Sequence, residues 1–516
     1  MSADLVLLNA NVITLNPNYP KAQAVAILKN RIAEVGANQQ IENCIGEKTQ
    51  ILDLKGKTVI PGLIDTHIHV ADFGRCLMWI DLTGAKSIVD LQNMLNEKAR
   101  STEDGKWIIG QGWNESRFRE HRMPNNADLD AVAPNNPVIL FREASMICVS
   151  NSKAQRIAGV NEETRVPQGG IIDKESKTGR LAGIFRDTAT SLIWQAIPEP
   201  SINDLIEASI IALQKVIKSG LTSIHWLVLS EIEITLIQRL YEQKKLPVRV
   251  NVVIPEGLLQ KAQVLESYGS SVMRFLGATI NVDGYLDSKE AALFEPYSDD
   301  PNNRGKLFST EATLSLSVEE LLSKGLQPII LAMGDRAVDV ALNVIEKSPK
   351  GRVRFRIEQA ALLNHDLVQR LGEQQVVVSI QPKVISTEFS VWSAIQRLGL
   401  DRARWLHPLK TLLSSGVRVV GGSDCPMEPL NPLLGIQDLV VRKFFPEERL
   451  TVKEALSAYT LDAAFSSGEE NLKGSVEEGK LADLVVLSED PFSIDPARIS
   501  MINVDFVIVD GEIVVS

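Results

Sequence analysis

The sequence predicts an α/β protein, a (β/α)8 TIM barrel joined to a composite β-sandwich domain that both termini build. Three observations predict it: strand-like segments at both ends, alternating strands and helices between them, and a length of 516 residues. The N-terminal DLVLLNANVITL and the C-terminal VDFVIVDGEIVVS are apolar runs split by turn residues. Neither end has enough strands to close a core alone. We therefore expect residues 1–60 and 471–516 to pair into one β domain.

The middle of the chain alternates helical and strand-like segments. The helical HDLVQRLGEQ precedes the strand-like QVVVSIQP, and LKTLLSSG precedes VRVVGGSD. Such alternation indicates βαβ units and a parallel sheet. The number of units and the chain length favour a barrel over an open sheet, spanning residues 61–470. Residues 72–200 are less regular, and we interpret them as an insertion after the first barrel strand that contributes to a lid.

Composition narrows the class of function. The formal net charge is −11, and 44% of residues are hydrophobic while 23% are charged, as in soluble globular proteins. An acidic surface disfavours nucleic acid and anionic membranes as partners, and no apolar run reaches the roughly 20 residues of a membrane helix. The four cysteines form no CxxC pair, which indicates reduced thiols in the cytoplasm. We expect a cytoplasmic protein with a small-molecule substrate; its size and acidity also suggest a homodimer.

Two segments carry the residue types of a metal site. In PGLIDTHIHV, His67 and His69 stand two residues apart, so they share one face of a strand and can reach one ion. In VRVVGGSDCP, a hydrophobic strand ends just before Asp424, whose carboxylate can bind a metal and take a proton from water. Catalytic groups of barrels lie at such strand ends. The alternatives are two histidines in a loop and an aspartate that caps a helix.

With these motifs in hand, the chain resembles the amidohydrolase superfamily, in its YtcJ-like, N-substituted formamide deformylase-like branch. The resemblance runs nearly end to end and rests on PGLIDTHIHV, GWNESRF, DGYLDSKEAALFEPYSDD, GDRAVDVAL, RIEQA and GGSDCPMEPLNPLLGI. It implies a metal-bearing (β/α)8 barrel and a composite β-sandwich. It also implies hydrolysis of an amide-type carbon–nitrogen bond other than a peptide bond.

The chain departs from the family pattern at several metal positions. Thr279 stands where the resemblance leads us to expect a carboxylated lysine, and Leu331 and Gln359 stand where it leads us to expect histidines. A two-metal site is therefore excluded. His67, His69 and Asp424 still supply the three ligands that a single catalytic zinc requires. We expect one divalent cation, zinc or else iron, with no bound metal as the remaining alternative.

Other residues are candidates for contact with substrate. Trp113, Asp283 and Gln359 are predicted to bind it, although Trp113 could instead anchor the insertion and Asp283 could shape the Asp-Gly turn. His225 and Glu358 are interpreted as hydrogen-bonded groups inside the barrel. The leading hypothesis is a metal-dependent hydrolase in which Asp424 also acts as the base. The alternative is a homologue that keeps the barrel and binds a small ligand without hydrolysing it.

Overall fold

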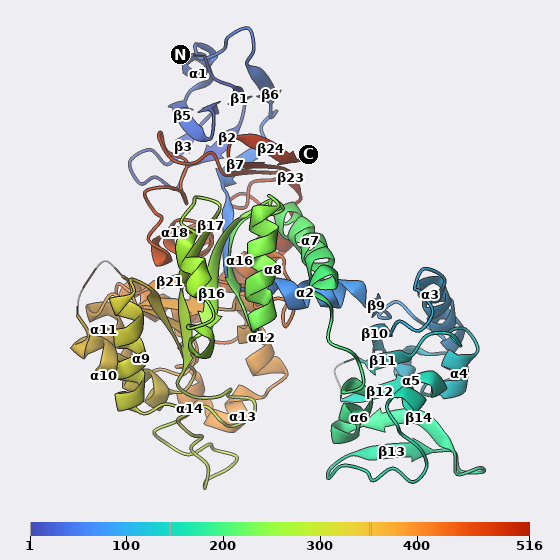
Figure 1. The fold of residues 1–516 in the computed structure, drawn as a ribbon. Coiled ribbons are helices and arrows are strands. Elements are labelled where there is room, and N and C mark those ends of the chain that lie inside the picture. Colours follow the sequence, from blue (N-terminus) through green and yellow to red (C-terminus); the bar gives the residue numbers. More distant parts are fainter. Residues whose placement is uncertain (1, 144–145, 350, 352) are drawn as a thin grey trace. The chain divides into compact units, whose positions relative to one another are not determined.

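A computed structural model describes residues 2–143, 146–349, 351 and 353–516 of the chain (Figure 1). These residues form two compact units. One combines Met1–Phe73 with Ser209–Ser516, and the other is Gly74–Ala208. None of the described helices is both long and apolar enough to cross a bilayer.

The first unit contains an eight-stranded parallel barrel, which confirms the predicted fold class. The strands follow one another around the barrel in chain order, beginning with the one that carries the His-x-His motif. They are β8 (Leu63–Ile68), β15 (Leu221–Leu227), β16 (Arg249–Pro255), β17 (Met273–Asn281), β18 (Gln327–Ala332), β19 (Arg356–Gln359), β20 (Val377–Ile380) and β21 (Arg418–Gly421).

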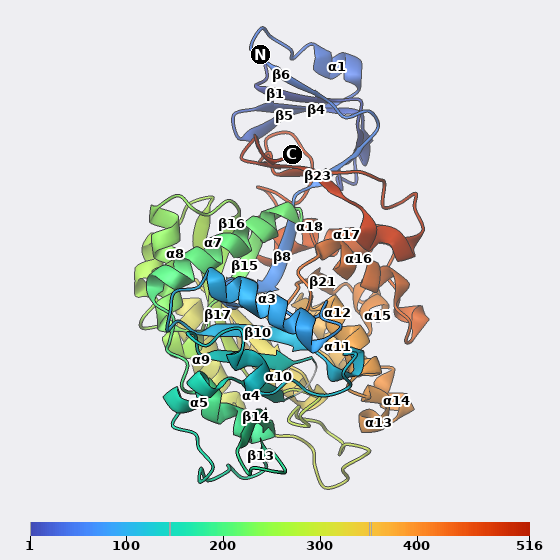
Figure 2. The ribbon, with the colours of Figure 1, turned by 90° about the vertical axis from the view of Figure 1, so that its right-hand side faces the viewer.

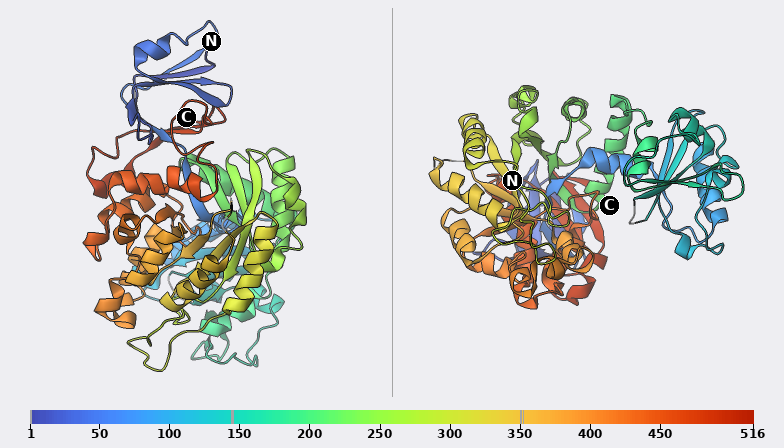
Figure 3. Two further views of the ribbon diagram at one scale, coloured as in Figure 1. Left: turned by 90° about the vertical axis from the view of Figure 1, so that its left-hand side faces the viewer. Right: turned by 90° about the horizontal axis from the view of Figure 1, so that it is seen from below.

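The barrel closes between its first and last strands. The Thr66 hydroxyl of β8 donates to the Gly421 carbonyl of β21 at 3.0 Å, and Ile68 pairs with Cys425 in a parallel bridge just beyond β21. Helices lie around the strands, as the view from below shows (Figure 3, right). The helices between successive strands include α8 (Glu231–Glu242), α9 (Glu311–Ser323), α10 (Asp335–Lys347), α11 (His365–Glu373) and α15 (Leu409–Ser414).

Both termini lie in a β-sandwich of the same unit (Figure 2). One sheet has the order β5 (Arg31–Gly36), β4 (Ala24–Leu28), β1 (Leu5–Leu8), β6 (Gln50–Asp53). The other has the order β24 (Glu512–Val515), β23 (Val504–Val509), β22 (Leu484–Leu487), β7 (Thr58–Pro61), β2 (Asn11–Ile13), β3 (Lys21–Ala22). The antiparallel pairing of β22 with β7 joins the C-terminal strands to the N-terminal ones, and one hydrophobic core contains residues from both ends.

The second unit has its own sheet and core. Its six strands are ordered β13 (Ile171–Lys174), β14 (Leu181–Arg186), β12 (Ile147–Ser150), β11 (Val138–Arg142), β10 (Ile108–Trp113), β9 (Ile80–Asp81). Its longest helix is α3 (Ile88–Arg100), which the Ser87 side chain caps at its N-terminus. The unit therefore has the elements of a small α/β domain within the segment that we interpret as an insertion.

Candidate metal centre

Three side chains from the first and last strands of the barrel, or from the residues that follow them, lie close together. His67 lies in β8, His69 directly follows that strand, and Asp424 lies three residues after β21. Their ligand atoms all lie within 4.8 Å of one another. Asp424 Oδ1 is 3.5 Å from His67 Nε2 and 3.3 Å from His69 Nε2. Among the described residues, this is the one group of three or more His, Cys, Asp and Glu side chains with such a geometry.

The backbone around these ligands is held together by a buried carboxylate. One oxygen of Asp65 accepts the backbone N–H of His67 at 2.9 Å and that of Ser423 at 3.0 Å. The N–H of Asp424 in turn donates to the His67 carbonyl at 2.7 Å. Burial raises the pKa of Asp65 to about 6, although these hydrogen bonds act in the opposite direction. The single carboxylate therefore connects both ligand-bearing segments.

The second glycine of the Gly-Gly-Ser-Asp sequence, Gly422, packs too closely against His67 to carry a side chain. A Cβ atom on Gly422 would lie 2.7 Å from both the backbone nitrogen and the Cβ of His67. Only glycine lets the two segments approach this closely. Asp424 itself adopts a left-handed backbone conformation with φ 56° and caps no helix, because α16 (Pro432–Val441) begins later with Asn431 as its N-cap. The helix-cap alternative for Asp424 is therefore wrong.

Both imidazoles use their Nδ1 atoms for protein contacts. His67 Nδ1 is 2.9 Å from Glu358 Oε2, and His69 Nδ1 is 3.2 Å from the Leu227 carbonyl oxygen. Burial lowers the pKa of His67, but the charges of Asp424 and Glu358 outweigh this effect and the net pKa is raised. The Nε2 atoms remain directed at Asp424. Two imidazole nitrogens and one carboxylate oxygen match the donor set of a catalytic zinc with an open position, so the residues fit a single divalent cation.

The strands β17 and β18 carry the two residues that replace expected metal ligands, Thr279 and Leu331. Leu331 pairs in register with Glu358 of the adjacent parallel strand, so both face the barrel interior. Ile329 lies two residues earlier on the same face, and Thr279 pairs with it from β17. A buried cluster fills this side of the barrel; its members are Leu227, Val253, Leu276 and Ile329. The structure thus places Thr279 and Leu331 in the barrel wall.

Behind His67 lies a fully buried ionic network. Arg356 forms a salt bridge with Glu358, and its guanidinium also donates to His225 Nδ1 at 2.7 Å and to the Thr66 carbonyl at 2.5 Å. Burial and the charge of Arg356 hold the pKa of His225 well below its usual value. His225 is thus a neutral hydrogen-bond acceptor inside the barrel, as its packing interpretation predicted, and not a replacement ligand.

The three predicted substrate-binding residues have different surroundings. Asp283 is buried and accepts backbone N–H groups of Ala292, Met333 and Gly334 at 2.8–2.9 Å. Burial raises the pKa of Asp283 to about 7 against the effect of these bonds. The carboxylate therefore holds the segment at Ala292 and the turn at Met333 and Gly334 to the end of β17, and its contact with substrate stays a prediction.

Gln359 and Trp113 differ in whether their polar side-chain atoms already have a hydrogen-bond partner. Gln359 ends β19 with φ 70°, and its side-chain oxygen is buried with no hydrogen-bond partner among the described residues. Trp113 is fully buried in the core of the second unit, where its indole N–H donates to the Leu140 carbonyl at 2.9 Å. The structure gives Trp113 a packing role and adds no support for a contact with substrate.

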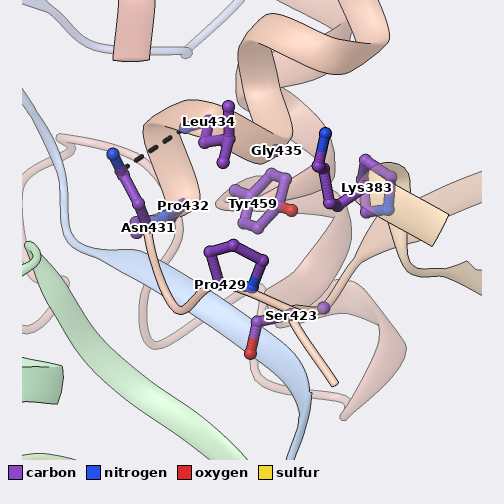
Figure 4. A pocket seen from close by; sticks show the side chains of 10 residues that line it. Lys383, Ser423, Pro429, Asn431, Pro432, Leu434, Gly435 and Tyr459 are labelled. Atoms are coloured by element: carbon purple, nitrogen blue, oxygen red, sulfur yellow. Dashed lines mark hydrogen bonds between the residues drawn. The ribbon is translucent and has the colours of Figure 1, made fainter. Parts of the chain in front are cut away.

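A separate small hollow lies near the turn that precedes Asp424 (Figure 4). Tyr459 lies at the centre of its lining, and burial holds the pKa of its phenol well above the usual value. A Cβ atom on Gly435 would come within 2.0 Å of the Tyr459 oxygen. None of the three candidate metal ligands lines this hollow, so it is not the metal centre.

Comparison with known proteins places this fold and site in a family. The chain matches the Amidohydrolase family over residues 50–515. It is 32% identical to the Bacillus subtilis (strain 168) protein YtcJ over 98% of each chain, and 26% identical to N-substituted formamide deformylase of Arthrobacter pascens over 98% of this chain and 97% of the other. The solved structure of an uncharacterized metal-dependent hydrolase from Pyrococcus furiosus is similar with a TM-score of 0.78 and 29% identity, covering 95% of this chain and 100% of the other. The chain belongs to the amidohydrolase family and is a metal-dependent hydrolase of that superfamily.

Proposed function

We propose that the protein hydrolyses a carbon–nitrogen bond of a non-peptide amide, using one divalent cation, zinc or else iron. The observation that carries this proposal is the meeting of His67 Nε2, His69 Nε2 and the Asp424 carboxylate at the mouth of the barrel. Thr279 and Leu331, which carry neither a carboxylate nor an imidazole, occupy the adjacent strands β17 and β18, which supports a single-metal site over a binuclear one.

Each residue of the centre has a distinct role in this mechanism. The Nε2 atoms of His67 and His69, together with Asp424, would hold the cation. When bound, a divalent cation polarises the amide carbonyl and lowers the pKa of water from 15.7 toward about 7. Asp424 takes a proton from the attacking water and delivers it to the amine nitrogen as the carbon–nitrogen bond breaks. Water and amide thereby become a carboxylic acid and an amine.

The surroundings support access and orientation of a small substrate. The Asp424 side chain is 18% exposed, so water and substrate can reach the carboxylate. The buried side-chain oxygen of Gln359, which has no partner in the part of the chain that the structure describes, would accept a hydrogen bond from a substrate N–H group. Similarity to a protein named N-substituted formamide deformylase makes N-substituted formamides the first compounds to test. We also propose a cytoplasmic location and a homodimer.

The test is release of formate and amine from a panel of N-substituted formamides, cyclic amides and ureas by the zinc-loaded protein. Hydrolysis that is lost in His67→Ala and retained in Glu388→Gln would support the proposal, because Glu388 lies outside the centre in a buried pair with His407. Binding of these amides by the zinc-loaded protein without cleavage of any of them would contradict it and favour the ligand-binding alternative.

A further inference from the structure

In the buried network behind His67, one carboxylate contacts the imidazole but is not among the candidate metal ligands. We propose that Glu358, fixed by Arg356, is a positioning residue that locks His67 in the tautomer whose Nε2 can bind a cation. The inference rests on the proposed metal function of His67. It adds to that function a residue that never contacts the cation.

The geometry determines where the imidazole proton must be. Glu358 Oε2 lies 2.9 Å from His67 Nδ1. Arg356 forms a salt bridge with the other oxygen of this carboxyl, and both side chains are fully buried, so Glu358 is ionised. An ionised carboxylate only accepts hydrogen bonds, so Nδ1 must carry the hydrogen. The lone pair of the neutral ring is then on Nε2, which faces Asp424 at 3.5 Å.

Arg356 fixes the carboxylate from the other side. It lies two residues before Glu358 on the same face of β19, and it forms a salt bridge with Glu358 Oε1. Its remaining donors are held by His225 Nδ1 at 2.7 Å, the Thr66 carbonyl at 2.5 Å and the Ser379 hydroxyl at 3.2 Å. The guanidinium cannot rotate away without losing these partners. The position of Glu358 is therefore set before any metal binds.

Glu358 is the side chain on which this tautomer depends. The second metal histidine, His69, contacts the backbone carbonyl of Leu227, which no side-chain substitution removes. In a Glu358→Gln variant, Arg356 can only donate hydrogen bonds, so the amide oxygen of the new side chain must face Arg356. Its NH2 group then faces His67 Nδ1 and requires that atom to accept. The imidazole hydrogen moves to Nε2, where it blocks the cation.

The first experiment measures zinc affinity by competition with a chelator in the wild-type, Glu358→Gln and Glu388→Gln proteins. Glu388 is a matched control, since it is also buried and lies 2.8 Å from a histidine, His407, outside the centre. We expect Glu358→Gln to weaken zinc binding by about 10–100-fold, the usual effect of losing a partner that orients a metal ligand. Glu388→Gln should bind zinc like the wild-type. Equal affinity of a folded Glu358→Gln protein and the wild-type would overturn the inference.

A second measurement reads the tautomer directly and does not require metal. The chain has six histidines, so the 15N shifts of the imidazoles can be assigned in metal-free, 15N-histidine-labelled protein at alkaline pH. We expect His67 to carry its hydrogen on Nδ1 in the wild-type and on Nε2 in Glu358→Gln. Addition of Arg356→Met to Glu358→Gln removes the donor that orients the amide, so the Nδ1–H tautomer and part of the zinc affinity should return.

These results separate the inference from the proposed function. A wild-type protein that binds no zinc but holds His67 in the Nδ1–H tautomer would contradict the proposed function and support the positioning role. A wild-type protein that binds zinc while Glu358→Gln leaves the His67 tautomer unchanged would contradict the positioning role alone. If Glu358→Gln does not fold, the double variant Arg356→Met/Glu358→Leu takes its place, because it buries neither charge and leaves His67 Nδ1 without its carboxylate partner. A His67 tautomer and a zinc affinity equal to those of the wild-type in this variant would overturn the inference.

Discussion

Substitution of Arg356 by methionine should destabilise the barrel, because it leaves the buried charge of Glu358 without its cation. Arg356 and Glu358 are both fully buried, and together with His67 they form one network. The pKa of Glu358 is about 2 against its ordinary 4.5. At 1.36 kcal/mol per pKa unit, this difference corresponds to about 3 kcal/mol of stabilisation of the ionised form. Breaking a buried pair by removal of one partner costs about 3–5 kcal/mol, so we expect Arg356→Met to lose that much stability at pH 7.

The pH dependence of this loss follows from the sign of the pKa change. A carboxyl whose pKa is lowered on folding contributes stability above its unfolded pKa, and this stability is lost as pH falls through the folded pKa. The deficit of Arg356→Met relative to wild-type should therefore be largest above about pH 4.5 and shrink toward pH 2.

The assay is denaturant unfolding of metal-free protein, followed by fluorescence, for the wild-type, both single variants and the double variant Arg356→Met/Glu358→Gln. Because the two charges depend on each other, the double variant should lose less than the sum of the single variants. Strictly additive losses in the four proteins would refute the reasoning. They would mean that Arg356 does not stabilise the charge of Glu358.

Three further outcomes are expected. Asp424→Asn should reduce hydrolysis by about 10²–10⁴-fold at saturating zinc, the range for loss of a general base, and an unchanged rate would remove Asp424 from that role. Gly422→Ala should weaken zinc binding and cost about 1–3 kcal/mol in thermal unfolding, because the new Cβ would press on His67; a variant as stable as wild-type would contradict the close approach. Lys473→Met should cost up to about 3 kcal/mol at pH 7, because the buried Glu469 loses its nearest cation and keeps only Arg274 at 3.5 Å. The cost should fall below about pH 4.5, where the lowered pKa of Glu469 ceases to stabilise the native protein. A pH-independent cost in chemical denaturation would be evidence against that pair.

Much of the fold could be predicted because the chain repeats one local pattern. Each barrel strand is a short apolar run that follows an amphipathic helix, and periodicity detects both elements. The pairing of the termini could be predicted from the shortage of strands at each end. The register that joins Leu484 to Pro61, by contrast, depends on contacts between distant segments that local patterns do not encode.

The candidate metal ligands could be proposed from the sequence, but the groups that hold them could not. His67 and Asp424 stand at the ends of apolar strands, and their residue types have a direct chemical meaning for metal binding. The contact of His67 with Glu358 joins residues 291 positions apart, and that of Asp65 with Ser423 joins residues 358 apart. Such partners become visible only when the barrel closes.

The role of Asp283 could not be decided from its residue type and its position in the sequence. Its position at a strand end suggested a contact with substrate, but the surrounding turns direct three backbone N–H groups at its carboxylate. A buried carboxylate that satisfies backbone donors and one that binds a ligand can occupy the same place in a sequence pattern. The distinction depends on the conformation of neighbouring loops, to which the residue type gives no guide.

The metal content of the purified protein tests the central claim most directly. Elemental analysis of the wild-type after dialysis against metal-free buffer should find about one equivalent of zinc or iron per chain, as expected for a site with three protein ligands. His67→Ala should lose it while Glu388→Gln keeps it. A wild-type protein that holds no divalent cation even after incubation with zinc, or a folded His67→Ala protein that binds zinc as tightly as the wild-type, would contradict the assignment of His67, His69 and Asp424 as a metal centre.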